Sequence, residues 1–334
     1  MKVNYQIILL ILFSFSIVSC GDEEDEDLMG NWSELSDFDG VPRSDAVGFS
    51  IGDKGYIGTG YDGDDRLSDF WEYNPSQNYW TQKADFPGVA RTGAVGFGIG
   101  DKGYIGTGYD GDNKMNDFYA YDPATNTWEK KADFKGTARY GAVGFVIDGK
   151  GYMGSGYDGN YLKDFYEYTP STDTWAQIIS IGGSKRFNAN SFVLEGKGYV
   201  ISGLDNGSYL SDMWSYDPST GSWTEMREIY DADDDNTFDD DYTSIARINA
   251  VGLEINGKGY LATGGTGTLL STIWEYDPVT DLWTERTAFE GLSRTDAVGF
   301  SIGSRGYVTT GRSSSYYLDD IWTFDPKAEY DEDN

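Results

Sequence analysis

A chain of 334 residues, of which 39% are hydrophobic and 16% aromatic, is long enough to bury a sizeable core. Its formal net charge of −31 repels phosphate backbones, which excludes nucleic-acid binding as a function. The sequence contains no histidine, and Cys20 is its single cysteine. This composition excludes disulfides within the chain, imidazole metal sites and nucleophilic catalysis by a Ser/His or Cys/His pair.

Residues 1–19 have the features of a signal peptide. Lys2 precedes a continuous apolar run, 7–18, which is too short to cross a bilayer. The sequence "IVSC" at 17–20 resembles the lipobox of bacterial lipoproteins, in which cleavage before the cysteine precedes its lipidation. We therefore expect a lipid on Cys20 and an anchor in the bacterial outer membrane. The alternative is a chance cysteine in an ordinary secretory signal.

Residues 20–28 continue from the lipidated cysteine into the acidic sequence "GDEEDED". A run of like charges cannot bury apolar surface, so we expect an extended, solvated tether. Acidic residues at this place also resemble a surface-export signal of some Gram-negative lineages. Exposure at the cell surface is therefore expected, with a periplasm-facing anchor as the alternative.

The rest of the chain consists of six repeats, each of which begins with an arginine. The second copy reads "RTGAVGFGIGDKGYIGTGYDG" from residue 91, and the other copies resemble it. The repeat length is close to constant except in the fourth copy, which carries an acidic insertion at 228–246. The six arginines are Arg43, Arg91, Arg139, Arg186, Arg247 and Arg294.

Each repeat is predicted to form four short β-strands and no helix, because apolar residues alternate with period two between turn residues. In the second copy the strands are "AVGFGI", "GYIGTGY", "DFYAYDP" and "TWEKKADF". The first of these alternates the small residues Ala94 and Gly96 with Val95 and Phe97. That alternation suits the innermost strand of a radial arrangement, where neighbouring sheets converge.

These repeats resemble the kelch motif over about residues 29–326. The resemblance rests on a tyrosine and a glycine that recur in every copy, Tyr104 and Gly108 in the second, and on a closing "YDPxTxxW"-like sequence. One departure is that Thr-Gly or Ser-Gly stands where the family has two glycines. The resemblance implies an all-β protein, a six-bladed kelch-type β-propeller over 29–328 with four antiparallel strands per blade.

The two ends of the repeat region are complementary. The last copy stops before its fourth strand, with Asp331 where the tryptophan of that strand should stand. The first copy is preceded by a surplus strand, "GNWSELSDF", at 30–38. We predict that the segment 29–38 closes the ring by completing the last blade, and that 329–334 forms an acidic tail.

The predicted ligand site lies at one mouth of the central channel. Because strands alternate in direction, the loop ending in each arginine and the loop after each second strand should emerge on one face. Seven arginines and two tyrosines are the predicted ligand contacts: Arg43, Arg91, Arg139, Arg186, Arg247, Arg294, Arg312, Tyr316 and Tyr317. The alternative for the six repeated arginines is a framework role, in which each binds carbonyl groups or an aspartate between blades.

The insertion includes a partial calcium-loop pattern. Its positions 1, 3, 5 and 9 are occupied by Asp231, Asp233, Asp235 and Asp239. Asn236 replaces the turn glycine and Tyr242 replaces the bidentate glutamate, which excludes an intact EF-hand. Calcium held by several carboxylates is one interpretation, and a solvated acidic loop is the alternative. No other cofactor is expected.

These observations favour a non-catalytic binding module for a glycan or a protein, with membrane contact through the lipid anchor only. Galactose oxidases share the propeller, but their copper chemistry requires histidines and a core cysteine, which this chain lacks. The enzymatic alternative is a carbohydrate isomerase that resembles the kelch-type sialic-acid mutarotases or epimerases. Sugar ring opening can proceed with carboxylate, arginine or tyrosine groups alone.

Overall fold

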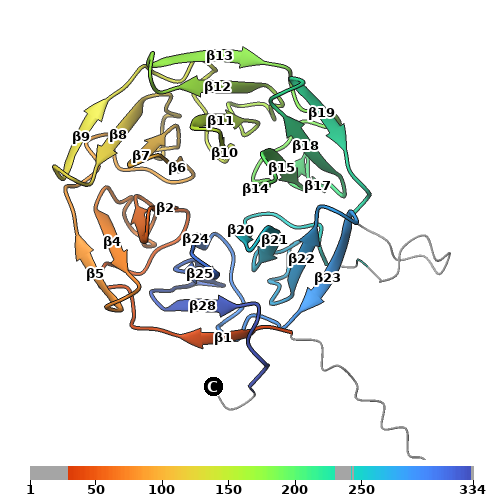
Figure 1. The fold of residues 1–334 in the computed structure, drawn as a ribbon. Helices are drawn as coiled ribbons and strands as arrows, with labels where there is room; N and C mark the ends of the chain where they lie inside the picture. Colours follow the sequence, from red (N-terminus) through yellow and green to blue (C-terminus); the bar gives the residue numbers. More distant parts are fainter. Residues whose placement is uncertain (1–28, 230–241, 243, 332–334) are drawn as a thin grey trace, which may run out of the picture.

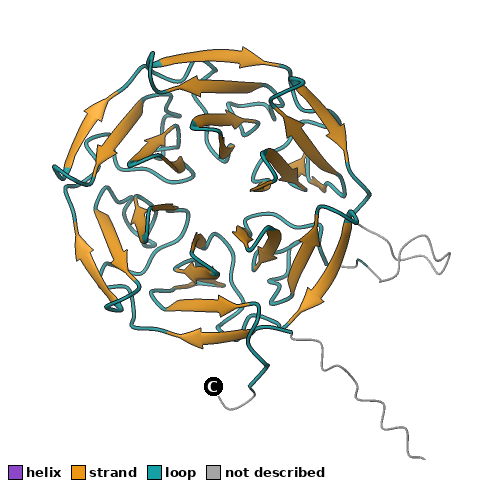
Figure 2. Ribbon diagram, viewed as in Figure 1, coloured by secondary structure: helices purple, strands orange, loops and turns teal. Residues whose placement is uncertain are grey.

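The computed structural model describes residues 29–229, 242 and 244–331. The described residues form strands, turns and loops only, arranged as six sheets around a central axis (Figures 1 and 2). Each of these sheets has four antiparallel strands. The prediction of an all-β, six-bladed propeller is therefore confirmed. No helix among the described residues is long and apolar enough to cross a membrane.

The first three blades follow the chain order from the innermost strand outward. Blade 1 contains β2 (Val47–Ile51), β3 (Lys54–Gly58), β4 (Phe70–Asn74) and β5 (Tyr79–Gln82). Blade 2 contains β6 (Val95–Ile99), β7 (Lys102–Gly106), β8 (Phe118–Asp122) and β9 (Thr127–Lys130). Blade 3 contains β10 (Val143–Ile147), β11 (Lys150–Gly154), β12 (Phe165–Thr169) and β13 (Thr174–Ile178).

Blades 4 to 6 repeat this order, except that the last blade takes its outer strand from the start of the chain. Blade 4 contains β14 (Asn190–Leu194), β15 (Lys197–Ile201), β18 (Met213–Asp217) and β19 (Ser222–Glu225). Blade 5 contains β20 (Val251–Ile255), β21 (Lys258–Ala262), β22 (Ile273–Asp277) and β23 (Leu282–Arg286). Blade 6 contains β24 (Val298–Ile302), β25 (Arg305–Thr309), β28 (Ile321–Asp325) and β1 (Asn31–Glu34).

Two small hairpins interrupt this regularity. In blade 4, β16 (Leu204–Asp205) pairs with β17 (Ser208–Tyr209) in the loop between the second and third strands. In blade 6, β26 (Arg312–Ser313) pairs with β27 (Tyr316–Tyr317) in the equivalent loop. The two hairpins therefore lie on either side of blade 5.

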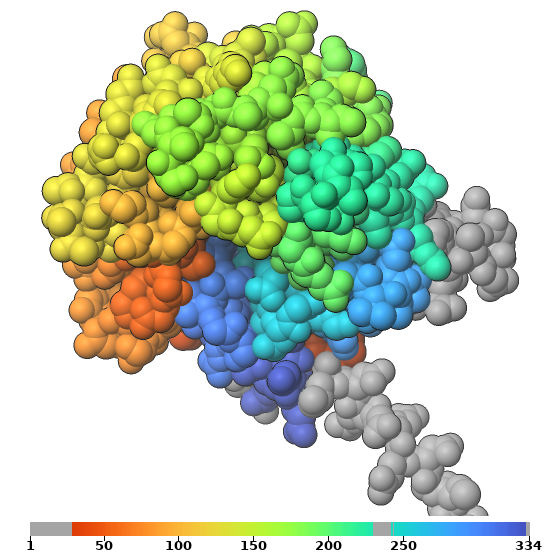
Figure 3. Space-filling view, turned by 45° about the horizontal axis from the view of Figure 1, so that its top comes forward, coloured from red at the N-terminus to blue at the C-terminus, as the bar shows by residue number. Residues whose placement is uncertain are grey.

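The ring closes as predicted. β1 pairs antiparallel with β28, with Trp32 opposite Phe324, and the first blade lies beside the last (Figures 1 and 3). Trp32 is completely buried between blades 5 and 6, where its ring lies 4.9 Å from those of Phe289 and Phe324. The closing strand thus contributes both a row of backbone hydrogen bonds and a core side chain.

Close packing of the innermost strands explains their small residues. On β2 the side chains of Val47, Phe49 and Ile51 are buried, whereas Gly48 faces the neighbouring blade. A Cβ atom at Gly48 would lie 2.7 Å from the Cβ of Val298 on β24. The alternation predicted from the sequence is therefore a requirement of converging sheets.

Candidate functional site

The six repeated arginines lie inside the blades, where each is completely buried. Arg43 donates to the Thr59 carbonyl at 3.0 Å and forms two hydrogen bonds, of 2.6 and 2.7 Å, with the Asp69 carboxylate. The same bidentate pairs are Arg91–Asp117, Arg139–Asp164, Arg186–Asp212 and Arg294–Asp320. The six side chains predicted to ring the channel mouth are therefore enclosed by the blades. Their placement matches the framework alternative, in which each fixes the loop between the second and third strands.

Blade 5 departs from this pattern. Arg247 has Thr272 where the other blades have aspartate, and donates to its carbonyl at 2.9 Å and its hydroxyl at 2.7 Å. Burial without a carboxylate partner lowers the pKa of Arg247 to about 9. In blade 5, Arg247 thus fixes the loop between the second and third strands through uncharged acceptors.

A closed ring of backbone hydrogen bonds surrounds this mouth of the channel. In each blade, the residue two positions after the repeated arginine donates its backbone N–H to the carbonyl of the equivalent residue in the preceding blade. The Gly93 N–H donates to the Asp45 carbonyl at 3.1 Å, and the Asp45 N–H closes the ring by donating to the Asp296 carbonyl at 3.0 Å. All six residues have φ between 52° and 58°, and are Asp45, Gly93, Gly141, Asn188, Asn249 and Asp296. Only glycine, asparagine and aspartate occur there, since these residues best tolerate left-handed backbone.

Two members of this ring, Asp45 and Asp296, form a carboxyl pair between blades 1 and 6. Arg312 donates from Nε to Oδ2 of Asp296 at 3.0 Å. Burial raises the pKa of Asp45 to about 7, and the adjacent Asp296 adds to the rise. Burial also raises the pKa of Asp296, against the lowering effect of Arg312. Burial thus favours the protonated form of both carboxyls.

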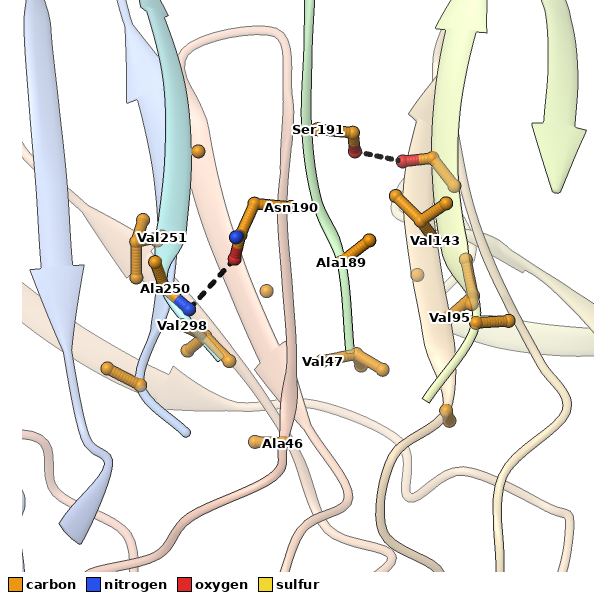
Figure 4. A pocket seen from close by; sticks show the side chains of 18 residues that line it. Ala46, Val47, Val95, Val143, Ala189, Asn190, Ser191, Ala250, Val251 and Val298 are labelled. Carbon is orange, nitrogen blue, oxygen red and sulfur yellow. Dashed lines mark hydrogen bonds between the residues drawn. The ribbon is translucent and has the colours of Figure 1, made fainter. Parts of the chain in front are cut away.

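The channel below this ring has a volume of about 230 Å³ and is lined mainly by alanine, valine and glycine (Figure 4). Its two polar lining side chains are already hydrogen-bonded. Asn190 accepts from the Ala250 N–H at 2.9 Å and donates to the Arg247 carbonyl at 2.9 Å, and Ser191 donates to the Gly144 carbonyl at 3.1 Å. Most of the surface exposed in the channel is nevertheless polar, so backbone groups, rather than these two side chains, would contact a ligand there.

Outside the mouth, one position per blade forms a rim. It follows the second strand and pairs with the residue after the repeated arginine, as Tyr61 pairs with Ser44. In chain order the rim residues are Tyr61, Tyr109, Tyr157, Leu204, Gly265 and Arg312. Blade 5 alone has no side chain there, and a Cβ atom at Gly265 would lie 2.1 Å from the Thr268 carbonyl oxygen.

A pocket of about 440 Å³ lies at this gap in the rim. Tyr209 of the blade 4 hairpin and Ser314 of the blade 6 hairpin border it on either side. The remaining lining residues are Ile248, Asn249, Gly265, Gly267, Thr268, Leu269, Thr295 and Arg312. We call this the blade 5 pocket.

Arg312 is the predicted ligand residue that the structure places in the blade 5 pocket. Its side chain is 42% exposed, and among the described residues only its Nε has a hydrogen-bond partner. Tyr316, 73% exposed, and Tyr317, whose ring lies 5.9 Å from that of Tyr61, belong to the same hairpin but do not line the pocket. Sequence reasoning missed Tyr209, Asn249 and the Asp45–Asp296 pair. The double glycine 264–265, found in the fifth copy alone, was the available signal.

Two of the remaining predictions concern residues outside those described. These are the lipid site Cys20 and the calcium-loop aspartates Asp231, Asp233, Asp235 and Asp239. Tyr242, at the last position of that loop, is buried, and its hydroxyl accepts from the Trp283 N–H at 3.0 Å. Among the described residues, no group of three or more acidic side chains could hold a metal ion.

Comparisons with known proteins agree with this architecture. The kelch motif family model matches residues 108–135 and 185–228. A solved structure entitled "Structure of YjhT" superposes with a TM-score of 0.71 at 17% identity, over 86% of this chain and 95% of that one. At this identity the likeness shows a shared fold. No curated protein matches the chain.

Proposed function

We propose that this kelch-type six-bladed β-propeller is a binding module that captures an acidic sugar in the blade 5 pocket. The fold supports a binding or scaffold role but names no ligand, so the proposal depends on the site. The observation that carries it is Arg312, whose terminal nitrogens lack partners among the described residues and whose side chain lines a pocket at a break in the rim.

The pocket chemistry matches a sugar that bears a carboxylate. A guanidinium group binds a carboxylate through two parallel hydrogen bonds, and Asp296 holds Arg312 through Nε, which leaves its other nitrogens available. Thr268, Thr295, Ser314 and Asn249 supply hydroxyl and amide groups for sugar hydroxyls. Tyr209, 39% exposed, supplies an aromatic ring at the border of the pocket.

The proposal extends to the location of the protein. The lipobox-like sequence before Cys20 supports a lipid anchor in the bacterial outer membrane, and the acidic run after it supports display at the cell surface. An anchored propeller would hold a glycan, or a protein bearing one, close to the membrane without a second membrane contact. The acidic surface of the chain would disfavour non-specific retention of anions, so selectivity would rest on the local Arg312 charge.

Binding to an array of acidic and neutral glycans tests this function. Arg312→Ala should weaken the best acidic ligand about tenfold or more, since a hydrogen bond to a charged partner contributes about 1.5–3 kcal/mol. Arg66→Ala is the matched control, because Arg66 lies on the same face over the Tyr61 and Tyr109 rings of blades 1 and 2. Equal loss in both variants would point to general electrostatics, and unchanged binding in Arg312→Ala would refute the blade 5 site.

A second candidate function is isomerisation of the same sugar, and the Asp45–Asp296 pair favours it. A carboxyl whose pKa is about 7 can both donate and accept a proton at neutral pH. Asn249 lines both the blade 5 pocket and the channel mouth where the pair lies, which connects the two. Faster interconversion of sugar anomers with the protein than with Asp45→Asn would support the enzyme; retention without turnover would support the binding module.

A further inference from the structure

The face opposite the blade 5 pocket carries a second repeated arrangement. In every blade a tyrosine of the second strand lies opposite one residue of the third strand. The six pairs are Tyr56–Glu72, Tyr104–Ala120, Tyr152–Glu167, Tyr199–Ser215, Tyr260–Glu275 and Tyr307–Thr323. Where the partner is glutamate, it accepts a hydrogen bond from the tyrosine hydroxyl, at 2.6 Å in blade 1 and 2.9 Å in blade 3.

Each of these glutamates also binds a cation. In blade 1 the Lys83 ammonium lies 3.1 Å from Glu72, and in blade 5 the Arg286 guanidinium lies 3.1 Å from Glu275. In blade 3 the cation is Lys150, which lies 2.8 Å from Glu167. A carboxylate that joins a tyrosine hydroxyl to a cation is thus a recurrent unit of the blades.

Blade 2 keeps the tyrosine and the cation but has no carboxylate. Ala120 stands opposite Tyr104. Lys131 occupies the place that Lys83 has in blade 1. The backbone N–H of Lys131 donates to the Phe118 carbonyl, just as the backbone N–H of Lys83 donates to the Phe70 carbonyl. Blades 4 and 6, which also lack the glutamate, have the uncharged Met226 and Leu35 at this place. Blade 2 therefore differs from blades 1 and 5 in having the cation at this place without the glutamate.

A cavity of about 530 Å³ lies between blades 2 and 3, and both Tyr104 and Lys131 line it. Tyr104 is only 4% exposed, and its hydroxyl has no hydrogen-bond partner among the described residues. Lys131 is 19% exposed, and its ion partner at 2.5 Å is Glu129, which is 67% exposed and therefore a weakly held partner. The Tyr104 hydroxyl and the Lys131 ammonium thus belong to residues that line a space large enough for a small molecule.

The surrounding charges restrict the ligand. Lys102 and Lys150 also line the cavity, but each already has a carboxylate partner, Asp122 at 3.0 Å and Glu167 at 2.8 Å. Asp101 and Asp148 line it as well, and their charges disfavour an anion with several negative charges. A single carboxylate matches the Tyr104 hydroxyl and the Lys131 ammonium, whose partner Glu129 is the most exposed of the three carboxylates paired with these lysines.

We propose that this cavity is a binding site for a carboxylate-bearing small molecule, whose carboxylate takes the place that glutamate has in blades 1, 3 and 5. The carboxylate accepts a hydrogen bond from the Tyr104 hydroxyl and pairs with the Lys131 ammonium. The turn 169–171 of blade 3 contacts the rest of the molecule. The site is separate from the blade 5 pocket, so neither proposal depends on the other.

Acetate is the probe, titrated at pH 7 and constant ionic strength against chloride, with the tyrosine ring carbons labelled for NMR. We expect a saturable shift of the Tyr104 resonance, which Tyr104→Phe identifies by its loss. Lys131→Met should weaken acetate at least tenfold, and sulfate should produce no saturable shift over the same concentrations. No response of Tyr104 to acetate, or an equal response in Lys131→Met, would overturn the proposal.

Ala120→Glu is the complementary variant, because it supplies the carboxylate within the chain. It should raise the melting temperature by a few degrees without acetate and abolish the acetate response. Ser215→Glu is the control for the acetate response, since it places glutamate opposite Tyr199 in blade 4, away from the cavity, and should leave the response of Tyr104 unchanged. If Ala120→Glu bound acetate like the parent protein, the proposal would fail. If Ala120→Glu did not fold, the acetate titration of Lys131→Met would still test the proposal.

Discussion

At the scale of single residues, repetition along the sequence marks two kinds of arginine. The six repeated arginines are buried and held by the loop they organise, as Arg43 is by Asp69 and Thr59. Arg312 occurs once, lies at the rim and keeps unpaired donors among the described residues. A side chain that recurs in every blade belongs to the framework, whereas a side chain that occurs in one blade alone is available for a ligand.

Removing a framework arginine should destabilise the fold. Arg43→Ala leaves the Asp69 carboxylate, whose side chain is 21% exposed, without its bidentate partner, and breaking a buried ion pair typically costs about 3–5 kcal/mol. Chemical denaturation of Arg43→Ala should show a loss of about 3 kcal/mol or more. Arg312→Ala, which removes a 42% exposed side chain, is the control and should lose far less. Equal stability of both variants would contradict a framework role.

The Asp45 carboxyl should make stability depend on pH around neutrality. Burial raises its folded pKa to about 7, above the unfolded value of 3.8, so the stabilisation is present at low pH and is lost as pH rises through 7. The contribution of Asp45 to the melting temperature should therefore fall from about pH 4 to 7 and level off above pH 7. The fall should be smaller in Asp45→Asn, since asparagine also tolerates the left-handed backbone at this position. An identical fall in both proteins would assign the titration to another group.

At the scale of elements, the closing strand β1 joins residues that are about 300 positions apart in the chain, such as Asn31 and Asp325. Its Trp32 fills the interface of blades 5 and 6, and its indole N–H donates to the Thr287 carbonyl at 3.3 Å. The hairpins of blades 4 and 6 also bring together residues that are far apart in the chain. Each hairpin places a residue at the border of the blade 5 pocket, Tyr209 from blade 4 and Ser314 from blade 6.

Trp32→Ala should therefore weaken the whole ring. Truncation of a fully buried tryptophan typically costs about 3–5 kcal/mol, and the midpoint of thermal unfolding should fall by several degrees. Met29→Ala, which changes a 38% exposed side chain at the start of the same segment, should have little effect. A deletion of residues 29–38 that left unfolding unchanged would show that β1 does not hold the ring closed.

At the scale of the whole molecule, the two faces of the propeller carry different chemistry. The channel-mouth face presents the blade 5 pocket with Arg312, and the opposite face presents the cavity between blades 2 and 3 with Tyr104 and Lys131. Both sites lie where a blade differs from some of its neighbours, at Gly265 in blade 5 and at Ala120 in blade 2. Six-fold repetition supplies the scaffold, and local departures from it supply the candidate sites.

The anchoring of the whole molecule is tested at Cys20. If the lipobox-like sequence directs lipidation, Cys20→Ala should move the protein from the membrane fraction to the soluble fraction. Metabolic labelling with a fatty acid should mark the parent protein and not the variant. Ser19→Ala, which keeps a small residue before the cysteine, should still be labelled and membrane-bound. Labelling of Cys20→Ala would refute this anchor.

The sequence by itself determined the strand content, the number of blades and the closure of the ring, because strand period, turn residues and repeat length are local properties that recur six times. It also predicted Arg312 as a ligand contact from its position in an unequal loop, and this side chain lines the blade 5 pocket. Only the tertiary structure decided that the repeated arginines are buried, since their aspartate partners stand 25 or 26 residues away. The Asp45–Asp296 pair and the meeting of Tyr209, Gly265 and Arg312 depend on neighbouring blades packing side by side. A repeat pattern describes one blade at a time, whereas both candidate sites form where two or three blades meet.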